Sequence, residues 1–235
     1  MAGICYRNDG EPIFTGYRYP LPDLDEIPFP ARRLFPIQKY RYSPLMLGKN
    51  IMDLVTSRGC PFRCNFCHTK ALSPKFRDQS PQKTIEEIKL LRSEYGADSL
   101  LFHNDILTAN KSNTRELCDL MIKENLVMHW SCLTHVNCLD EELLVKMKAA
   151  GCYQIWFGVE SGSQRLLDFC NKNLKLDTAR EVFAMCNKHG IMTHALFSLG
   201  LPGETREETK QTIDFAIEID PCFAQFSLAS PLKGT

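Results

Sequence analysis

Three closely spaced cysteines carry the most sharply defined chemistry of this chain. Cys60, Cys64 and Cys67 form a C-x3-C-x2-C motif in the segment SRGCPFRCNFCHT. One loop with this spacing can place three thiolates at three corners of a [4Fe–4S] cube. No fourth cysteine follows at ferredoxin spacing, so one iron would stay open for another ligand. The motif therefore predicts an iron–sulfur cluster with one free coordination position.

Three alternatives compete for the same cysteines. Zinc can take three thiolates and His68, although adjacent Cys67 and His68 would be strained around one tetrahedral centre. The run from Cys64 to His68 also spells the C-x-x-C-H of a c-type haem, an attachment made outside the cytosol that would leave Cys60 unused. Buried structural thiols are the third alternative, but the neighbouring Pro, Arg and Asn make a poor core. The spacing favours the iron–sulfur cluster over all three.

Six short apolar runs define the elements that must position this loop. They are too continuously apolar for strands with one wet face, so they predict strands covered on both sides. Their ranges are 51–57, 99–103, 128–135, 153–159, 193–200 and 223–230.

Helix start signals lie between these runs. Ser80 before Pro81 and Asp140 before an apolar face are N-cap signals. Thr205 with Glu208 fits a capping box, and Thr84 with Glu87 fits a second one.

Six strands alternating with helices predict an α/β fold built from βα units and a parallel sheet. Right-handed connections curl such a sheet into a barrel or spread it into a doubly wound layer. We expect a partial (β/α)6 TIM-like barrel over residues 51–235, truncated after the sixth strand, whose outward apolar side chains would be exposed. In both architectures the chemistry belongs at the C-terminal strand ends.

The first fifty residues differ from the rest of the chain. They hold seven of the 13 prolines, too many for a helix or a central strand. We expect residues 1–50 to form an extended, linker-like segment laid over another part of the protein. Its expected apolar anchors are Leu24, Ile27, Phe29, Leu34 and Phe35.

Composition excludes several classes of protein. The chain has 235 residues, 28 basic and 28 acidic, so it offers no bulk charge for nucleic acid or an anionic membrane. We find no secretory signal and no apolar run of the roughly 18 residues that span a bilayer. Eleven cysteines without an export signal indicate reduced thiols and a cytoplasmic location.

Together with the aromatic Phe66, the cysteine motif resembles that of the radical S-adenosylmethionine (SAM) enzymes. Further segments resemble the subgroup that often carries an upstream cobalamin-binding domain, and DLDEIPFPARRLF (23–35) resembles its linker. The core segments are LLFHNDILTAN (100–110), AGCYQIWFGVESGS (150–163), SLGLPGET (198–205) and PLKGT (231–235).

The resemblance implies that the chain binds a [4Fe–4S] cluster through the three cysteines and cleaves SAM to a 5′-deoxyadenosyl radical. An external one-electron reductant, such as a flavodoxin or ferredoxin, would supply the electron. Methyl transfer to a small-molecule or lipid-like substrate is the expected reaction, with cobalamin held by an upstream domain. The alternatives are a non-catalytic iron–sulfur or zinc module and an inactive fragment of a longer enzyme.

The expected SAM-binding residues follow from the same resemblance. Glu160 would hold the ribose hydroxyls or the methionine ammonium, and His135 stands where relatives often have arginine. His103 is the expected proton donor. The full expected set is Phe66, Asn104, Asp105, His135, Glu160, Ser161, Gly200 and Pro202. We expect buried, structural thiols at Cys118, Cys132, Cys138, Cys152, Cys170, Cys186 and Cys222.

Overall fold

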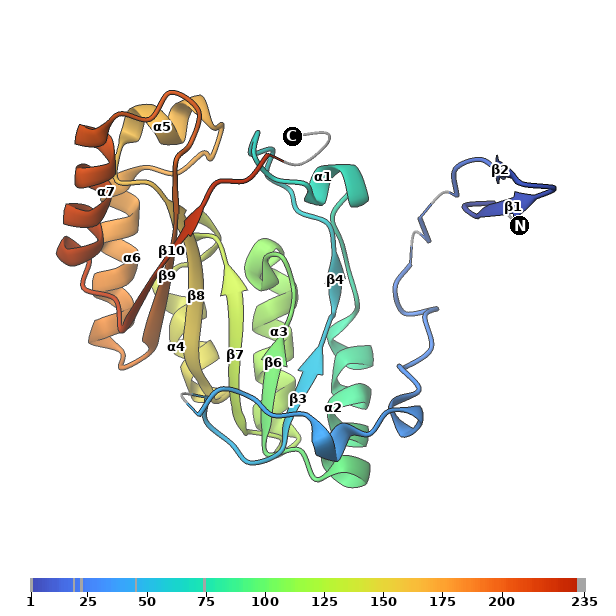
Figure 1. The fold of residues 1–235 in the computed structure, drawn as a ribbon. Helices are drawn as coiled ribbons and strands as arrows, with labels where there is room; N and C mark the ends of the chain where they lie inside the picture. The colour runs from blue at the N-terminus through green and yellow to red at the C-terminus, as the bar shows by residue number, and fades with distance from the viewer. Residues whose placement is uncertain (1, 19, 22, 45, 74, 232–235) are drawn as a thin grey trace.

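A six-stranded parallel sheet forms the centre of the computed structural model, which describes residues 2–18, 20–21, 23–44, 46–73 and 75–231 (Figure 1). The strand order is β10-β9-β8-β7-β6-β3, so each strand lies beside its predecessor along the chain. The strands are β3 (Ile51–Leu54), β6 (Ser99–Phe102), β7 (His129–Thr134), β8 (Cys152–Glu160), β9 (Met192–Leu199) and β10 (Phe223–Leu228). These bounds confirm the six predicted strands to within a few residues.

Helices connect the strands and cover one face of the sheet, as Figure 1 shows. The opposite, concave face is left open, which confirms a partial TIM-like barrel. Two helices rather than one link β8 to β9. The helices are α2 (Pro81–Tyr95), α3 (Lys111–Lys123), α4 (Glu141–Ala149), α5 (Gln164–Phe169), α6 (Leu176–Lys188) and α7 (Arg206–Glu218).

The predicted helix caps are present with one exception. Ser80 accepts a hydrogen bond from the backbone N–H of Lys83, and Thr205 forms a reciprocal capping box with Glu208. Asp140 likewise caps α4. The expected second box at Thr84 is wrong: Thr84 lies inside α2 and donates its hydroxyl hydrogen to the carbonyl of Ser80. The helix begins at the earlier cap, Ser80, because Pro81 suits the first helical position.

The main core lies between the outer face of the sheet and the helices. Phe102, Trp130, Phe157 and Phe197 point there and are almost completely buried. On the concave face Ser131 and Gln154 are buried, whereas Leu133 and Trp156, nearer the C-terminal strand ends, are only half-buried. The edge strand β10 is largely exposed. The expectation of cover on both faces is therefore wrong for β10 and for the C-terminal ends of the inner strands. The expected exposure of the outer side of β10 is confirmed at Leu228, which is 80% exposed.

The N-terminal segment contains elements that the proline count did not predict. A hairpin of β1 (Cys5–Asn8) and β2 (Glu11–Phe14) lies apart from the sheet in Figure 1. Two short 3-10 turns follow, η1 (Arg32–Leu34) and η2 (Ile37–Lys39).

Docking of this segment is partly polar. Leu24 is buried, and Ile27 and Phe29 are half-buried, as expected. Leu34 and Phe35 are 70% and 59% exposed, so they are not anchors. Arg32 anchors the turn instead, through Glu87 at 2.7 Å and the carbonyl of Asp53 at 2.9 Å.

A small second layer frames the cysteine loop. After β3 the chain leaves the sheet as β4 (Ser57–Arg58), which pairs antiparallel with β5 (Arg77–Asp78). The short helix α1 (Thr69–Leu72) lies between them in the chain. This departure explains why the first sheet strand is shorter than predicted. The expected PLKGT end falls mostly on residues 232–235, outside the described residues. No helix in the described part of the chain is long and apolar enough to cross a bilayer.

Candidate active site

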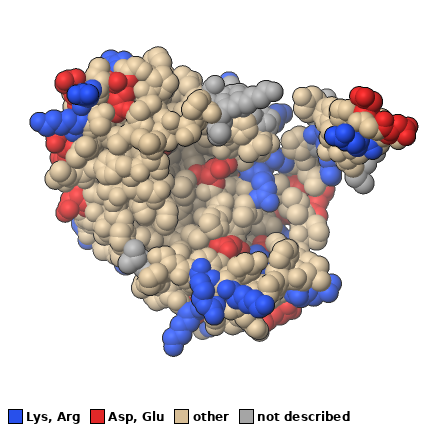
Figure 2. Space-filling model, in the orientation of Figure 1, with Lys and Arg blue, Asp and Glu red and all other residues tan. Residues whose placement is uncertain are grey.

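A cavity of about 440 Å³ lies at the C-terminal ends of the sheet strands. Figure 2 views the concave side of the sheet, which is hollowed at its centre and has acidic and basic side chains in the hollow. Residues of β6, β7, β8 and β9, and of the loops that follow β4 and β6, line the cavity. This is the position at which the fold was expected to carry its chemistry.

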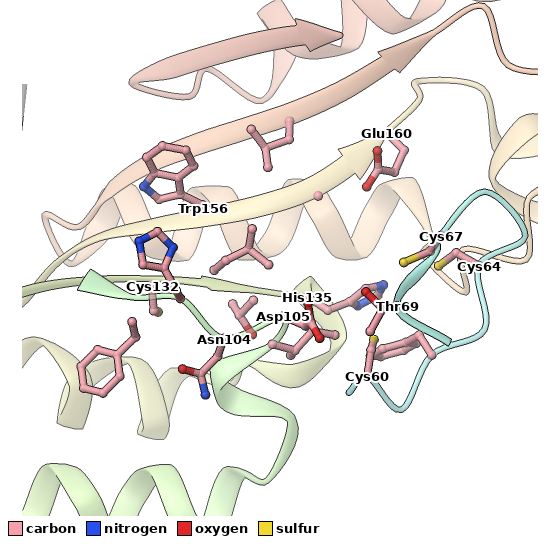
Figure 3. Close-up of a pocket in the computed structure, with 18 of the residues that line it drawn as sticks. Cys60, Cys64, Cys67, Thr69, Asn104, Asp105, Cys132, His135, Trp156 and Glu160 are labelled. Carbon is pink, nitrogen blue, oxygen red and sulfur yellow. The ribbon is translucent and has the colours of Figure 1, made fainter. Parts of the chain in front are cut away.

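All three motif cysteines line this cavity. Figure 3 shows Cys64 and Cys67 close together and Cys60 across from them. The loop is fastened to the end of α5, because the Asn65 side chain donates to the carbonyl of Phe169 at 3.0 Å. Gly59 lies at φ +81°, and a Cβ there would meet the carbonyl oxygen of Lys75 at 2.5 Å. Glycine is therefore required for the turn that enters the loop.

The donor set fits an iron–sulfur cluster better than one metal ion. Within the described residues, no three His, Cys, Asp or Glu side chains are placed to hold a single ion. A cube offers a separate iron to each thiolate, so its ligands need not converge on one point. Burial raises the pKa of Cys60 and raises that of Cys64 to about 11. Bound metal would supply the positive charge that stabilises these thiolates.

Glu160 points into the cavity from the end of β8, as Figure 3 shows. Its Oε1 accepts a hydrogen bond from Lys172 Nζ at 3.0 Å, and its Oε2 accepts one from Ser198 Oγ at 2.9 Å. The Lys172 and Glu160 side chains are 9% and 14% exposed. Gly158 leaves room for the pair, because a Cβ there would lie 2.6 Å from Glu160 Oε1. A buried, paired carboxylate and ammonium therefore line the cavity together.

His135 also lines the cavity, but its ring is occupied by the protein. Nδ1 accepts from the backbone N–H of Asn137, so Nε2 carries the hydrogen that faces the carbonyl of Lys172 at 3.2 Å. The ring stacks on Phe62 with centroids 4.0 Å apart. Burial, and then the charge of Lys172, lowers the pKa of His135 to about 4. The neutral ring has no charge for a carboxylate and no free nitrogen.

The other expected residues of the β6 loop and the cysteine loop reach the cavity. The side-chain amide of Asn104 donates hydrogen bonds from Nδ2 to the hydroxyls of Thr56 and Ser57, with Nδ2 2.7 Å from Ser57 Oγ. Asp105 lines the cavity and is exposed there. Phe66 lines it and packs against a small cluster that contains Leu166, Cys170 and Leu201.

Three expected residues do not line the cavity. Ser161 is fully buried, and its hydroxyl contacts Thr212 Oγ1 at 3.2 Å. Gly200 and Pro202 form the turn before α7, where the N–H of Gly200 donates to Glu204. Of the seven cysteines expected to be buried, six are, whereas Cys222 is exposed after the end of α7. The structure therefore brings together the β6, β7 and β8 ends but not the β9 turn.

Sequence reasoning missed Lys172, Thr69 and Trp156, which all line the cavity. Lys172 lies in NKNLK, a run typical of a solvated surface. Trp156 lies in a predicted strand, in which side chains alternate between the two faces of the sheet. This alternation is the sequence signal that could have placed Trp156 on the inward face. Its ring packs on His194 with centroids 4.2 Å apart.

Comparison with known proteins agrees with this geometry. A family model described as the Radical SAM superfamily matches residues 54–216. The chain is 34% identical over 236 residues to a protein named uncharacterized methyltransferase PH0819 of Pyrococcus horikoshii, covering 100% of this chain and 50% of that protein. It is 34% identical to the cytidylyl-2-hydroxyethylphosphonate methyltransferase of Streptomyces wedmorensis, covering 91% and 42%. The chain thus spans half or less of the length of these relatives.

Two solved structures share the fold. The cobalamin-dependent S-adenosylmethionine radical enzyme OxsB, with aqua-cobalamin bound, superposes with a TM-score of 0.73 at 19% identity, covering 96% of this chain and 33% of OxsB. The methyltransferase TsrM from Kitasatospora setae gives 0.69 at 19% identity, covering 76% and 36%. At this identity the likeness concerns the fold, a parallel sheet curled into a partial barrel.

Proposed function

The chain belongs to the radical SAM superfamily, and on that basis we propose that it binds a [4Fe–4S] cluster through Cys60, Cys64 and Cys67 and reductively cleaves SAM. One observation carries the proposal: three reduced thiols line a single cavity together with the Glu160–Lys172 pair. When bound, the cluster supplies the electron that converts SAM to methionine and a 5′-deoxyadenosyl radical.

The residues of the cavity divide the binding of SAM between them. Lys172 offers the positive charge that a carboxylate requires. The ring of His135 holds the Lys172 carbonyl, and so keeps the lysine at the cavity. Glu160 and Asp105 are the carboxylates available to an ammonium group or to ribose hydroxyls. Phe66 covers the same site with an apolar ring.

For the whole protein, we propose methyl transfer that uses cobalamin and an external one-electron reductant, such as a flavodoxin or ferredoxin. Two relatives named as methyltransferases and two cobalamin-binding structures of the same fold support this reaction. The substrate class is a small or lipid-like molecule that enters the open cavity.

The cluster is tested by anaerobic reconstitution of the 235-residue chain followed by iron and sulfide analysis. About four iron and four sulfide per chain are expected from one cube. Cys60→Ala, Cys64→Ala and Cys67→Ala should each abolish the cluster, because the sequence from 60 to 67 contains no fourth cysteine. Cys222→Ala is the matched control, since this thiol is exposed and outside the cavity.

Cleavage is tested by adding dithionite and SAM to the reconstituted protein. Slow release of 5′-deoxyadenosine without substrate is expected and is measured by liquid chromatography. Stoichiometric zinc without sulfide in anaerobically purified protein, together with failed iron reconstitution, would contradict the proposal.

A further inference from the structure

His103 and Asp53 form a side-chain pair at the cavity that the binding of the cluster and SAM does not use. His103 Nε2 lies 2.9 Å from Asp53 Oδ1. The two strands run side by side, with Asp53 opposite Leu101, so His103 lies two residues further along the same face. Asp53 Oδ1 is buried and has no hydrogen bond within the described residues, which leaves the imidazole as its neighbour.

Tyr42 fixes the state of this carboxylate. Its hydroxyl donates a hydrogen bond to Asp53 Oδ2. Burial, and then that hydrogen bond, raises the pKa of Tyr42, so the phenol stays protonated and acts as the donor. Asp53 thus accepts a hydrogen bond on Oδ2, and its Oδ1, 2.9 Å from His103 Nε2, has no other partner within the described residues. The His103 tautomer with hydrogen on Nε2 is the one that can donate to this oxygen, and it leaves Nδ1 unprotonated.

The nearby cation does not compete for Asp53. Arg32 contacts the backbone carbonyl of Asp53, while its guanidinium pairs with Glu87 at 2.7 Å. The histidine side chain is 55% exposed and lines the same cavity as Glu160 and the cysteines. The imidazole of His103 therefore lines the space in which a substrate would meet SAM.

We propose that His103 is the general base of this enzyme and that Asp53 orients it. In a histidine–carboxylate pair, the carboxylate fixes the ring tautomer and compensates the charge the ring gains with a proton. The substrate O–H or N–H bond breaks, its electron pair stays on the heteroatom, and the proton moves to Nδ1 of His103. Bulk water then takes the proton from the ring. This inference rests on the proposed function, and it specifies a substrate with a hydroxyl or amino group beside the reacting carbon.

The first test reads the ring directly. Long-range ¹H–¹⁵N spectra of the ¹⁵N-histidine-labelled 235-residue chain, with its cluster oxidised, report which ring nitrogen carries hydrogen. His103 should be the Nε2–H tautomer, and Asp53→Asn should remove that preference. His189→Gln is the matched control, because His189 Nε2 pairs with Glu141 at 2.8 Å outside the cavity. An Nδ1–H ring in the wild type, or an unchanged ring in Asp53→Asn, would overturn the proposal.

The second test measures proton acceptance with 4-nitrophenol as the probe, at a pH where the free phenol is protonated. Wild-type protein should give a saturable phenolate absorbance, and His103→Gln should lose it. Tyr42→Phe, which keeps both members of the pair, should reduce the signal and covers the case that Asp53→Asn fails to fold. Phenolate that persists in His103→Gln, or no phenolate in the wild type, would contradict the assignment of His103 as the general base. The wild-type 5′-deoxyadenosine assay is independent, so failure of the proposed function is recognised separately.

Discussion

At the scale of single residues, the part-buried ion pair of Glu160 and Lys172 distinguishes this cavity. Glu160 lies at φ 72°, a left-handed conformation that costs a non-glycine residue of the order of 1–3 kcal/mol. The bulge between Gly158 and Glu160 produces that turn and aims the carboxylate inward. Lys172 and Ser198 then hold it. Such strain, held by surrounding contacts, is typical of functional sites.

Replacing this lysine tests whether its charge serves the ligand. Lys172→Met keeps the length of the side chain but removes its charge, and leaves Glu160 buried without a cation. We expect SAM to bind the reconstituted protein about 10- to 100-fold more weakly, equivalent to about 1.5–3 kcal/mol for a hydrogen bond to a charged group. Equilibrium dialysis with radiolabelled SAM gives the affinity.

The control for this substitution is Lys175→Met, three residues further along the chain. Lys175 is exposed and pairs with Asp168 outside the cavity, so its loss should leave SAM affinity unchanged. Equal weakening by both substitutions would show that a general electrostatic effect, and no specific contact, is responsible.

How much of the site was predictable depended on local spacing. The cysteines and Glu160 were found because motif spacing and a strand end are visible in a sequence. Lys172 was not, because its partner is 12 residues away and their contact exists only after α5 has folded back. The contacts of His135 were not predicted for a similar reason, since its stacking on Phe62 joins two distant segments.

At the scale of elements, Glu208 ties the start of α7 to the start of α5. It accepts hydrogen bonds from Ser163 Oγ at 2.7 Å and Arg165 Nε at 2.8 Å, and it closes the capping box with Thr205. These contacts, the Arg165 hydrogen bond first, lower the pKa of Glu208 to about 2. One side chain thus joins the helix that follows β8 to the helix that follows β9.

A defined pH dependence of stability follows. The folded-state pKa of Glu208 lies below its unfolded value of about 4.3, so its contribution is complete above that value and is lost as the pH falls towards 2. In circular dichroism melts of the cluster-free chain, Glu208→Gln should lower the melting temperature at pH 6 and should flatten its fall below pH 4.5. Glu207→Gln, an exposed neighbour in the same turn, should change neither. If the melting temperatures of the wild type and Glu208→Gln change in parallel with pH across this range, the stabilising role of the Glu208 contacts is refuted.

The elements themselves were the most predictable level. Continuous apolar runs fixed the six strands, and cap residues such as Ser80 and Asp140 fixed the helix starts. The hairpin β1–β2 and the pair β4–β5 were missed because strands of two to four residues carry too little periodicity. The division of the β8–β9 connection into α5 and α6 was missed as well.

At the scale of the whole molecule, the last strand leaves an apolar surface uncovered. β10 pairs with β9 alone in the described structure, and its other edge is open. On its outer face Phe226 stacks on Phe197 with centroids 5.1 Å apart yet stays 41% exposed, and Leu228 is 80% exposed. An open edge beside exposed apolar side chains favours pairing with another chain. The isolated chain should therefore associate as its concentration rises.

A double substitution tests this surface directly. Phe226→Ser with Leu228→Lys removes the two exposed large apolar side chains of β10 and places a charge at the open edge, which disfavours strand pairing. Sedimentation velocity across a concentration series should show association of the wild type and a monomer for the double variant. Ile122→Lys is the control, because Ile122 is an exposed apolar residue on α3, away from β10, and its change should leave association intact. Association that survives the double substitution would locate the contact elsewhere, whereas a monomeric wild type would show that this exposed face does not by itself drive assembly.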